Sequence, residues 1–597
     1  VFQPDPRCSA LPGEHHRGMA APVGPRGFAG LSPGVAVAGR RICSKASACW
    51  DGARPRAYGS CPTRPVREAC GLAACDWREK SSPFGVSAAI AVAAAMGAAA
   101  TTGASCSDGP PLEPENHVEM SNWSGTHQLT TESLFSPETV EELEALVAWA
   151  SRSKKKIRPI GSGMSPNGLA LNHSGMLSMA QLDKVIKIDV KARTITAQAG
   201  ARVSTILEEL GKHGLTLSNF SSVQEQQIGG WTQTGAHGTG ARIPTVDEMV
   251  IGMKLVTPGQ GTLELKPTGP TAELFRLARV GLGALGVVAE VTMTCIPKYT
   301  LHERTYVTNA KDLRANHAKL LQTYRHVRYM WIPYTDTIVV VASDIPKAGV
   351  VPRPALPESE RVKPLRDLLR ELDPDCGPLD DDNFAQLREK LLQIDPLNPR
   401  HVARVNRAEA EFWTRSAGER IADSTEVLGF ECGGSQWVLE NCFPCGTIDR
   451  PSLADIDYLE ELKRMIESEG IAAASPIEQR WTSRSTSPMS AAYSPNAGDI
   501  FSWVGVIMYI TPEEKADAIK EKFREYAMRH ADLTFKYKGV FHWAKLDIDF
   551  HRGRSRLGEL RRQLQRRFDL VAFQAQRKAL DPNNILGNRL TDTALRL

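Results

Sequence analysis

This sequence lacks a large excess of either positive or negative charge. Its 597 residues include 72 Lys and Arg and 68 Asp and Glu, which leaves a net charge of +4. Residues 1–80 hold 12 basic and 6 acidic residues, so they contribute +6 and the rest of the chain contributes −2. A body so nearly balanced gives no reason to expect a nucleic-acid partner, and 42% hydrophobic residues suffice for more than one globular core.

Cysteines at metal-ligand spacing are also nearly absent. Seven of the 12 cysteines fall within the first 106 residues, in a stretch rich in Ala, Gly, Pro and Arg that lacks helical or strand periodicity. Cys442 and Cys445 form a single C-x-x-C without a second pair, so no zinc site is predicted. Cys432, beside two glycines, is a candidate for an exposed thiol close to a functional site.

The first 82 residues are predicted to be a transit or leader segment that is disordered or removed. Their Arg-rich, acid-poor composition is typical of organellar transit peptides, with a mitochondrial one preferred and a plastid one as the alternative. Residues 83–104 form an Ala-rich hydrophobic segment, long enough to span a bilayer but only weakly apolar. A sorting segment that is removed and a retained anchor are both open, and either would bring the mature chain to a membrane.

Residues 115–297 have the pattern of an α+β domain. Ser136, followed by Pro137 and an apolar stripe, predicts a helix that is capped at this serine. Short strands and a helix at about 203–213 follow.

The pattern changes after residue 297. Residues 298–545 are predicted to form a second, substrate-side α/β cap domain, with a helix at about 313–324 and a single strand through 329–342. Residues 546–597 are predicted to return and pack against the first domain.

Two glycine-rich loops are candidates for holding a diphosphate. They lie at 161–168 and 235–240, each next to a strand, and their consecutive Gly and Ser residues expose backbone N–H groups to a phosphate. Each loop taken alone is more typical of a tight turn, but the pair without a Walker lysine favours a dinucleotide. Residues 281–286 fit G-x-G-x-x-G, yet a helical segment precedes them and a strand follows, so no Rossmann site is predicted.

Four motifs in the first domain resemble the FAD-binding domain of the vanillyl-alcohol oxidase family. They are GSGMS at 161–165, NF at 219–220, EQQIGG at 225–230 and GAHGTG at 235–240. The resemblance implies an α+β flavoprotein fold with two domains, a PCMH-type FAD-binding domain and an α/β cap domain.

Three further motifs are similar to the plant-type aldonolactone dehydrogenases of that family, and the likeness extends from about residue 121 to residue 590. They are NWSGTH at 122–127, SPIEQRWT at 475–482 and HWAK at 542–545. This resemblance implies oxidation of L-galactono-1,4-lactone to L-ascorbate with FAD as cofactor and cytochrome c as electron acceptor. It also implies a place at the mitochondrial inner membrane, facing the intermembrane space. Two alternatives stay open: an oxygen-using aldonolactone oxidase, and a chain that acts mainly as an assembly factor of respiratory complex I.

The resemblance assigns the FAD contacts to residues in and around these motifs. They are Pro159, Gly161, Ser162, Gly163, Met164, Ser165, Asn219, Ser221, Ser222, Gln227, Gly229, Gly230, Gly235, His237, Gly238, Gly240, Val288, His542 and Lys545. Covalent members of the family carry a flavin-bound histidine where Met164 stands, and a thioether cannot form that bond, so noncovalent FAD is expected. Ser221 occupies a position where oxidases often have glycine and dehydrogenases have alanine. Its size should obstruct oxygen, which makes poor oxygen reactivity a hypothesis.

Glu478, Arg480 and Lys545 are the candidate catalytic residues. The first two are two residues apart, so on a strand they share one face, although such a pair is more commonly a surface salt bridge. The resemblance implies that Arg480 meets the lactone carbonyl and that Glu478 meets a hydroxyl as positioner or base. Lys545 is assigned the positive charge near flavin N1 and O2, with a solvated strand-edge lysine as the alternative. His542 is a weaker candidate, and His237 is predicted to orient a phosphate loop rather than to transfer protons.

Overall fold

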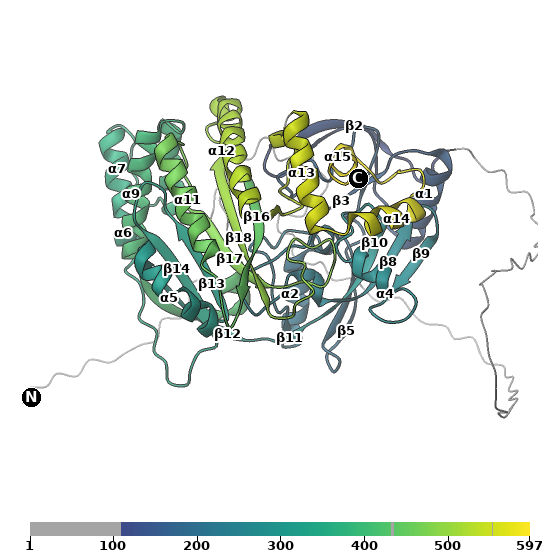
Figure 1. Ribbon diagram of the computed structural model, residues 1–597, viewed down its shortest axis with the longest axis horizontal. Helices are drawn as coiled ribbons and strands as arrows, with labels where there is room; N and C mark the ends of the chain where they lie inside the picture. Colours follow the sequence, from purple (N-terminus) through teal and green to yellow (C-terminus); the bar gives the residue numbers. More distant parts are fainter. Residues whose placement is uncertain (1–108, 431–434, 552, 597) are drawn as a thin grey trace, which may run out of the picture.

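The structure is a computed structural model, and it describes residues 109–430, 435–551 and 553–596. The predicted leader, the hydrophobic segment 83–104 and Cys432 lie outside these residues. Within the described ranges, no helix combines the length and the apolar character that a membrane span requires. Two α+β units lie side by side, the N-terminal one in purple to blue and the second in teal to green (Figure 1).

Two main sheets build the N-terminal unit. The smaller sheet pairs β1 and β2 antiparallel and β2, β4 and β3 parallel, in the order β1(Glu115–Ser121), β2(Gln128–Phe135), β4(Met176–Ser178), β3(Arg158–Ile160). The larger sheet is antiparallel, in the order β5(Val185–Asp189), β6(Thr194–Gln198), β10(Val287–Thr294), β8(Val250–Thr257), β9(Gly261–Leu265). The remaining elements of this unit are α2(Val203–Lys212), α3(Ile228–Gln233), η2(Val246–Met249), α4(Ala272–Ala278) and the short pair β7(Leu215–Thr216) and β11(Ile296–Pro297).

Helix α1(Val140–Ser153) begins later than its sequence predicts. Thr139 is the N-cap, and its Oγ1 accepts a hydrogen bond from the Glu142 amide at 3.1 Å. The Glu142 carboxylate accepts in turn from the Glu138 amide at 2.8 Å. The predicted cap at Ser136 is therefore wrong, because the later threonine and glutamate together satisfy two amides at the helix start.

One antiparallel sheet of eight strands forms the base of the second unit. Its order is β15(Gly418–Asp423), β12(Thr300–Thr308), β14(Ile338–Asp344), β13(His326–Trp331), β17(Ile477–Ser483), β18(Asp499–Tyr509), β16(Gln436–Thr447), β19(Val540–Phe541). Strand β18 thus separates β16 from β17. Residues of β16 and β17 that are 40 apart in sequence therefore lie on strands with only β18 between them.

The predicted single strand at 329–342 is in fact the hairpin of β13 and β14. Pro333 has no N–H to donate to a sheet ladder, and Tyr334 takes a left-handed φ of 63° in the turn. The two strands pair from His326 with Ser343 to Trp331 with Ile338. The prediction failed because the apolar pattern continues across the turn.

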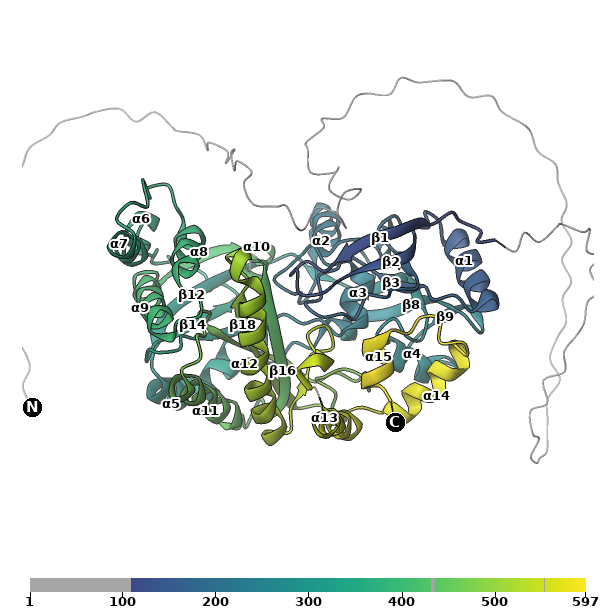
Figure 2. The same cartoon turned by 90° about the horizontal axis from the view of Figure 1, so that it is seen from above.

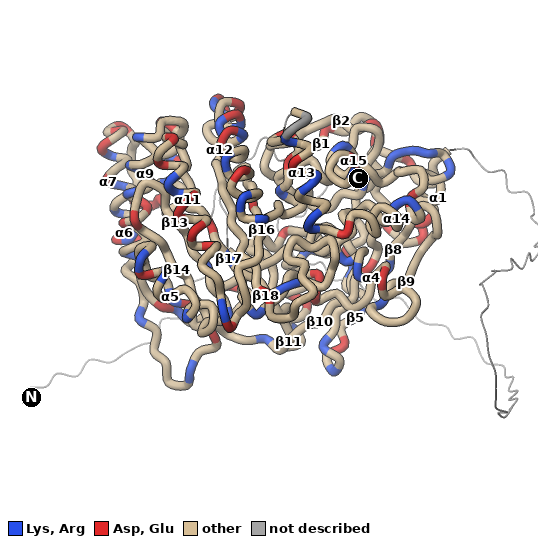
Figure 3. The backbone as a smooth tube through the Cα atoms, viewed as in Figure 1, with Lys and Arg blue, Asp and Glu red and all other residues tan. Residues whose placement is uncertain are grey.

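Helices flank the large sheet, with α5 against β13 and α12 against β16 and β18 (Figures 1 and 2). The helical elements of this unit are α5(Ala310–Thr323), α6(Glu358–Arg361), α7(Lys363–Leu372), α8(Phe384–Ile394), α9(Pro399–Arg415), α10(Ser424–Leu428), α11(Ala454–Glu469), η3(Glu513–Lys515) and α12(Ala516–Lys536). Basic and acidic residues are interspersed along these helices, with no face of one sign in the view of Figure 3.

The C-terminal segment lies beside the N-terminal unit, where Figure 1 draws it in yellow. It consists of η4(Ile548–His551), α13(Arg554–Arg567), α14(Leu570–Leu580) and α15(Arg589–Ala594). The Asn588 side chain donates to the carbonyls of Gly168, Leu169 and Leu171 at 2.9 to 3.0 Å. The Ile157 amide donates to the Ile585 carbonyl at 3.0 Å. These contacts tie the end of the chain to the first glycine-rich loop.

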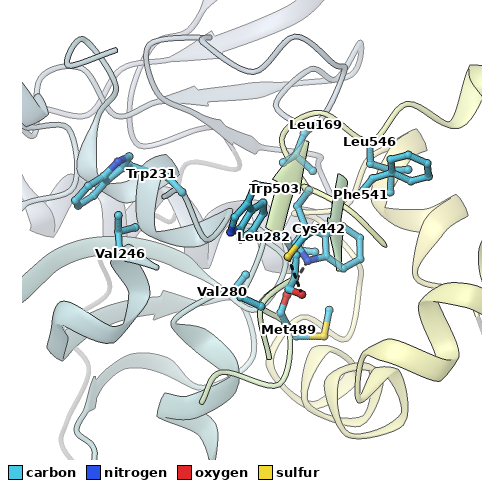
Figure 4. Packing of buried hydrophobic residues seen from close by; sticks show 14 of the residues in the cluster. Leu169, Trp231, Val246, Val280, Leu282, Cys442, Met489, Trp503, Phe541 and Leu546 are labelled. Carbon is cyan, nitrogen blue, oxygen red and sulfur yellow. Dashed lines mark hydrogen bonds between the residues drawn. The ribbon is translucent and has the colours of Figure 1, made fainter. Parts of the chain in front are cut away.

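The main hydrophobic core is continuous across both units. Figure 4 shows part of it, with Trp231 and Val246 from the first unit and Trp503 and Cys442 from the second. Trp503 is 1% exposed, and its indole N–H donates to Thr482 Oγ1 at 2.9 Å. A shared core of this kind holds the two units in a fixed relation, so a site between them is well defined.

Candidate active site

A deep cavity opens where the two units meet. Its first wall comes from the loop after β3, residues 221–223, the start of α3 and the start of β10. Its second wall comes from β16, β17 and β18 and from residues 542–545. The cavity contains about 1610 Å³ of space outside protein atoms, part of it open to solvent. Because both units bound this space, a ligand that binds there can contact both of them.

The loop at 161–165 presents backbone amides to this cavity. Its carbonyls are occupied from outside: the Gly163 carbonyl accepts from the Trp123 amide at 2.8 Å, and the Ser165 carbonyl accepts from Asn122 Nδ2 at 3.0 Å. Among the described residues, no acceptor receives a hydrogen bond from the five amides of this loop. Gly163 supplies a φ of 65°, which the tight turn requires. The arrangement is suited to an anion such as a diphosphate.

Glycines also allow the loop and α3 to approach each other. A Cβ on Gly161 would lie 2.9 Å from Gln227 Oε1, and a Cβ on Gly229 would lie 2.9 Å from the Ala199 Cβ. Gln227 Oε1 is buried and has no hydrogen-bond partner among the described residues. A ligand that carries both acceptor and donor groups, as a dinucleotide does, would satisfy this oxygen and the free amides together.

Most of the predicted cofactor residues line the cavity. They are Pro159, Gly161, Ser162, Gly163, Met164, Ser165, Ser221, Ser222, Gln227, Gly229, Gly230, His237, Val288, His542 and Lys545. Asn219, Gly235, Gly238 and Gly240 do not line it. The contacts with a ligand that the resemblance implies for these four residues are therefore not supported by the geometry.

The second glycine-rich loop connects the two units. The Gly240 amide donates to the Trp481 carbonyl of β17 at 2.7 Å. A Cβ on Gly238 would lie 2.1 Å from Asn219 Oδ1, so glycine is needed there for close packing. Of this loop, Ala236 and His237 reach the cavity.

Three residues of the segment 281–286, namely Leu282, Gly283 and Gly286, line the cavity although the segment is not a Rossmann turn. The chain runs from α4 through this segment into β10, the order that excluded a Rossmann site. Leu282 and Gly283 face the cavity, and their carbonyls accept from the buried Arg158 guanidinium at 2.7 and 3.0 Å. The glycine pattern at 281–286 marks this part of the cavity wall in the sequence, although it does not mark a Rossmann site.

The three candidate catalytic residues meet on the second wall. Glu478 and Arg480 lie on β17 and share a face, with 3.3 Å between Glu478 Oε2 and Arg480 Nη2. Lys545 follows β19 and lines the same wall. The structure therefore brings together one carboxylate and two cations that are up to 67 positions apart in the sequence.

Glu440 joins the two cations and was not predicted. It lies on β16, and its carboxylate is 2.9 Å from Arg480 Nη2, 2.5 Å from Lys545 Nζ and 3.2 Å from His237 Nε2. Burial would raise the pKa of Glu440, but Lys545, His237 and Arg480 outweigh it and hold that pKa well below the usual range. The only signal in the sequence was one charged residue inside an apolar strand.

Two histidines lie in this cluster. Burial lowers the pKa of His237, with Glu440 opposing, and burial together with Lys545 lowers the pKa of His542 well below its usual value. The His237 ring stacks on Trp503 with centroids 3.8 Å apart. His237 therefore contacts both the carbonyl of Gly238 in its own loop, at 3.0 Å, and the Glu440 carboxylate.

The Ser221 hydroxyl is held within the protein. It lies 2.5 Å from Gln226 Oε1, accepts from the Trp231 indole N–H at 3.1 Å and donates to the Val223 carbonyl at 3.2 Å. Ser221 nevertheless lines the cavity. The residue therefore adds bulk to the cavity wall while its polar atom is engaged elsewhere.

Two family models match the chain in succession. One, described as "FAD binding domain", matches residues 131–265. The other, described as "D-arabinono-1,4-lactone oxidase", matches residues 291–594.

Named relatives cover most of the chain. It is 48% identical over 503 residues to the mitochondrial L-galactono-1,4-lactone dehydrogenase of Brassica oleracea, which covers 80% of this chain and 83% of that protein. It is 46% identical to L-galactono-1,4-lactone dehydrogenase 2 of Oryza sativa subsp. japonica, over 80% and 84% of the two chains. The L-gulonolactone oxidase of Bos taurus is 27% identical over 72% of this chain and 89% of its own.

The fold itself has a counterpart among solved structures. Cholesterol oxidase from B. sterolicum superposes with a TM-score of 0.64 over 82% of this chain and 99% of that chain, at 17% sequence identity. At such identity the likeness concerns the fold alone, and it supports the two-domain flavoprotein architecture.

Proposed function

Because this chain belongs to the family of the L-galactono-1,4-lactone dehydrogenases, we propose that it oxidises L-galactono-1,4-lactone to L-ascorbate and transfers the electrons to cytochrome c. One observation carries the proposal: a single cavity has a loop of unpartnered amides on one wall and Glu478, Arg480 and Lys545 on the other. Such a cavity can hold a dinucleotide and a polar substrate face to face.

FAD is the cofactor. The FAD-binding match covers the loop at 161–165 and Gln227, and these residues would hold the diphosphate and its neighbouring groups. When bound, FAD supplies the acceptor for the hydride that leaves the substrate.

The flavin is held without a covalent bond. Met164 lines the cavity where covalent members of the family carry a histidine, and its thioether offers no nitrogen for such a link. Unfolding in guanidinium followed by ultrafiltration should therefore carry the yellow colour into the filtrate. Colour that stays with the protein would contradict noncovalent binding.

Glu478 and Arg480 would act on the lactone, and Lys545 on the flavin. Oxidation removes a hydride from the carbon that bears the hydroxyl and the proton of that hydroxyl, which gives a carbonyl. Negative charge develops on the neighbouring lactone carbonyl when the adjacent C–H proton then leaves to solvent and the enediol forms. The Glu478 carboxylate, 20% exposed, would accept the hydrogen bond and then the proton of that hydroxyl. Arg480 would donate to the carbonyl oxygen. Lys545 brings a second positive charge to the same wall and would stabilise the negative charge of the reduced flavin near N1 and O2.

Electron transfer to cytochrome c competes with reaction with oxygen, as in an aldonolactone oxidase. The side chain of Ser221 is larger than a glycine and keeps bulk at the cavity wall, which supports slow reaction with oxygen. Hydrogen peroxide output in air, compared with the rate of cytochrome c reduction, tests this. Peroxide formation as fast as cytochrome c reduction would favour the oxidase alternative.

The relatives are named mitochondrial, and this supports a mitochondrial location for the present chain. We place the enzyme at the inner membrane, facing the intermembrane space, where cytochrome c is available. A role in complex I assembly is the second candidate function. An Arg480→Ala variant that loses lactone oxidation and still supports complex I assembly would show that the two roles are separate.

The decisive experiment is an anaerobic absorbance titration of the FAD-loaded protein. L-galactono-1,4-lactone should bleach the flavin band, and added cytochrome c should then restore it. L-gulono-1,4-lactone serves as the comparison that defines the substrate range. A folded protein that takes up no FAD, or a flavin band that no lactone changes, would refute the proposal.

A further inference from the structure

Glu440 stands at one end of a row of residues that crosses three strands. Glu478 on β17 pairs with Gly505 on β18, and Gly505 pairs with Glu440 on β16. Directly opposed residues of antiparallel strands face the same side of a sheet, so both glutamates share the cavity side. Gly505 has no side chain, and a Cβ there would lie 4.0 Å from Glu440 Oε1. The open space above Gly505 lets Arg480 reach across β18 to Glu440.

The Glu440 carboxylate holds one cation on each oxygen. Oε1 accepts from Arg480 Nη2 at 2.9 Å, and Oε2 accepts from Lys545 Nζ at 2.5 Å. A carboxylate is a rigid planar group, so the two contacts fix the separation of the guanidinium and the ammonium. The same Arg480 nitrogen lies 3.3 Å from Glu478 Oε2, so both carboxylates hold this end of the guanidinium.

Burial separates Glu440 from the residues that meet a substrate or the flavin. Its side chain is 2% exposed, whereas Glu478 and Lys545 are 20% and 21% exposed. A carboxylate so far from solvent acts through its neighbours. A buried carboxylate stays charged only when a cation pairs with it. Here the partners are the Arg480 guanidinium and the Lys545 ammonium.

The alternative role for Glu440 is to bind a metal ion together with nearby histidines. His237, Glu440 and His542 bring ligand atoms within 4.8 Å of one another. However, the Glu440 oxygen nearest to His237 already contacts the Lys545 ammonium. The positive charge at this point is therefore supplied by the lysine.

We propose that Glu440 is a positioning residue of the reaction, which holds Arg480 and Lys545 at a fixed separation so that one cation meets the substrate and the other meets the flavin. The inference rests on the proposed lactone oxidation. Without Glu440, two like charges on one buried wall would repel each other and turn away from the substrate and the flavin.

Three variants of the FAD-loaded enzyme test the proposal. Glu440→Gln keeps the shape and removes the charge, while Glu440→Asp keeps the charge but is too short to reach both cations. Glu409→Gln is the matched control, because Glu409 is 1% exposed and pairs with Arg388 Nε at 3.0 Å on α9, outside the cavity. We expect kcat/KM for the lactone to fall about 100-fold with Gln and about 10-fold with Asp. Flavin content should not change, and the control should lower Tm but not kcat/KM.

A second measurement separates positioning from a general loss of structure. In an Arg480→Lys background, Glu440→Gln should cost much less activity than it does in the wild type, because the group that it positions is already altered. A purely structural effect would lower kcat/KM by the same factor in both backgrounds.

Each outcome decides between the alternatives. Wild-type kcat/KM in Glu440→Gln, or equal factors in both backgrounds, would overturn the inference. If Glu440→Gln does not fold, Glu440→Asp decides, and full activity of that variant would overturn it equally. A failure of the proposed function appears instead as a wild-type protein that no lactone reduces.

Discussion

At the scale of single residues, the proposed catalytic wall depends on one guanidinium that contacts two carboxylates. Arg480 Nη2 lies 2.9 Å from Glu440 and 3.3 Å from Glu478, so its plane is fixed before a substrate arrives. Such preorganisation is effective because the donors need not reorient as charge develops. A lysine has no planar fork and cannot reproduce this geometry.

We therefore expect Arg480→Lys to lower kcat/KM for the lactone by about 100-fold or more, since a donor to a developing negative charge is typically worth this factor. FAD content should be unchanged, because the amide loop that we propose for the diphosphate lies on the opposite wall. Stopped-flow measurement of flavin reduction gives the rate. Arg420→Lys, on the exposed edge strand β15, is the control. A loss of less than 3-fold, on the order of 0.6 kcal/mol by the usual conversion, would contradict this role.

At the scale of elements, helix α3 is held against the sheet of the N-terminal unit. The Ile228 and Gly229 amides donate to the carbonyls of Ala201 and Ala199 at 2.9 and 2.8 Å. This contact leaves no room for a side chain at Gly229, whereas a Cβ on Gly230 would meet nothing within 4 Å. Two adjacent glycines therefore serve different purposes.

Gly229→Ala should destabilise the FAD-free protein by about 1–3 kcal/mol, because the added methyl group overlaps Ala199. Gly230→Ala should leave the FAD-free protein as stable as the wild type and should weaken FAD binding, since its methyl group enters the cavity. Thermal unfolding without FAD and a fluorescence titration with FAD measure the two effects. Equal stability loss in both variants would refute this assignment.

The start of α1 offers a second test at this scale. Thr139→Ala removes the N-cap and should cost about 1 kcal/mol. Ser136→Ala should change stability by less than about 0.5 kcal/mol, because no cap is lost there. The shift of the urea midpoint reports both values. A larger effect at Ser136 would restore the cap that the sequence suggested.

At the scale of the whole molecule, buried histidines make stability depend on pH. Burial lowers the pKa of His326 to about 4, of His530 to about 3 and of His551 to about 4. In the unfolded chain a histidine takes up its proton near pH 6.5, so between about pH 6.5 and 4 the unfolded state binds more protons. Stability must therefore fall as the pH falls through this window. Asp247, Glu409 and Asp581, whose pKa values burial raises, act in the opposite direction.

We expect Tm to decrease steadily from pH 7 to pH 4.5, because each such histidine contributes up to about 1.4 kcal/mol per pH unit. His530→Gln should make this dependence shallower, and His213→Gln, at an exposed position, should not. Differential scanning calorimetry of the FAD-loaded protein over this range is the measurement. A Tm that rises as the pH falls would show that the carboxylates dominate.

Local patterns in the sequence predicted much of the site. The glycine-rich loop at 161–165 and the pair Glu478 and Arg480 are recognisable because a tight turn and strand alternation depend on neighbouring residues only. The start of α1 was misplaced by three residues because Ser136 and Thr139 are both acceptable caps and the choice depends on the contacts of Glu142. The hairpin of β13 and β14 was missed because its apolar pattern runs through the turn.

The sequence by itself determined the chemical groups available in this protein. They are a turn that exposes amides, a methionine in place of a flavin-bound histidine, and a carboxylate and a guanidinium two residues apart. Only the tertiary structure decided which groups act together. Glu440 becomes the partner of Arg480 and Lys545 because strand order places β16 beside β18 and next but one to β17. The loop at 235–240 ties the units together for the same reason, since long-range pairing, and not local pattern, sets what each residue contacts.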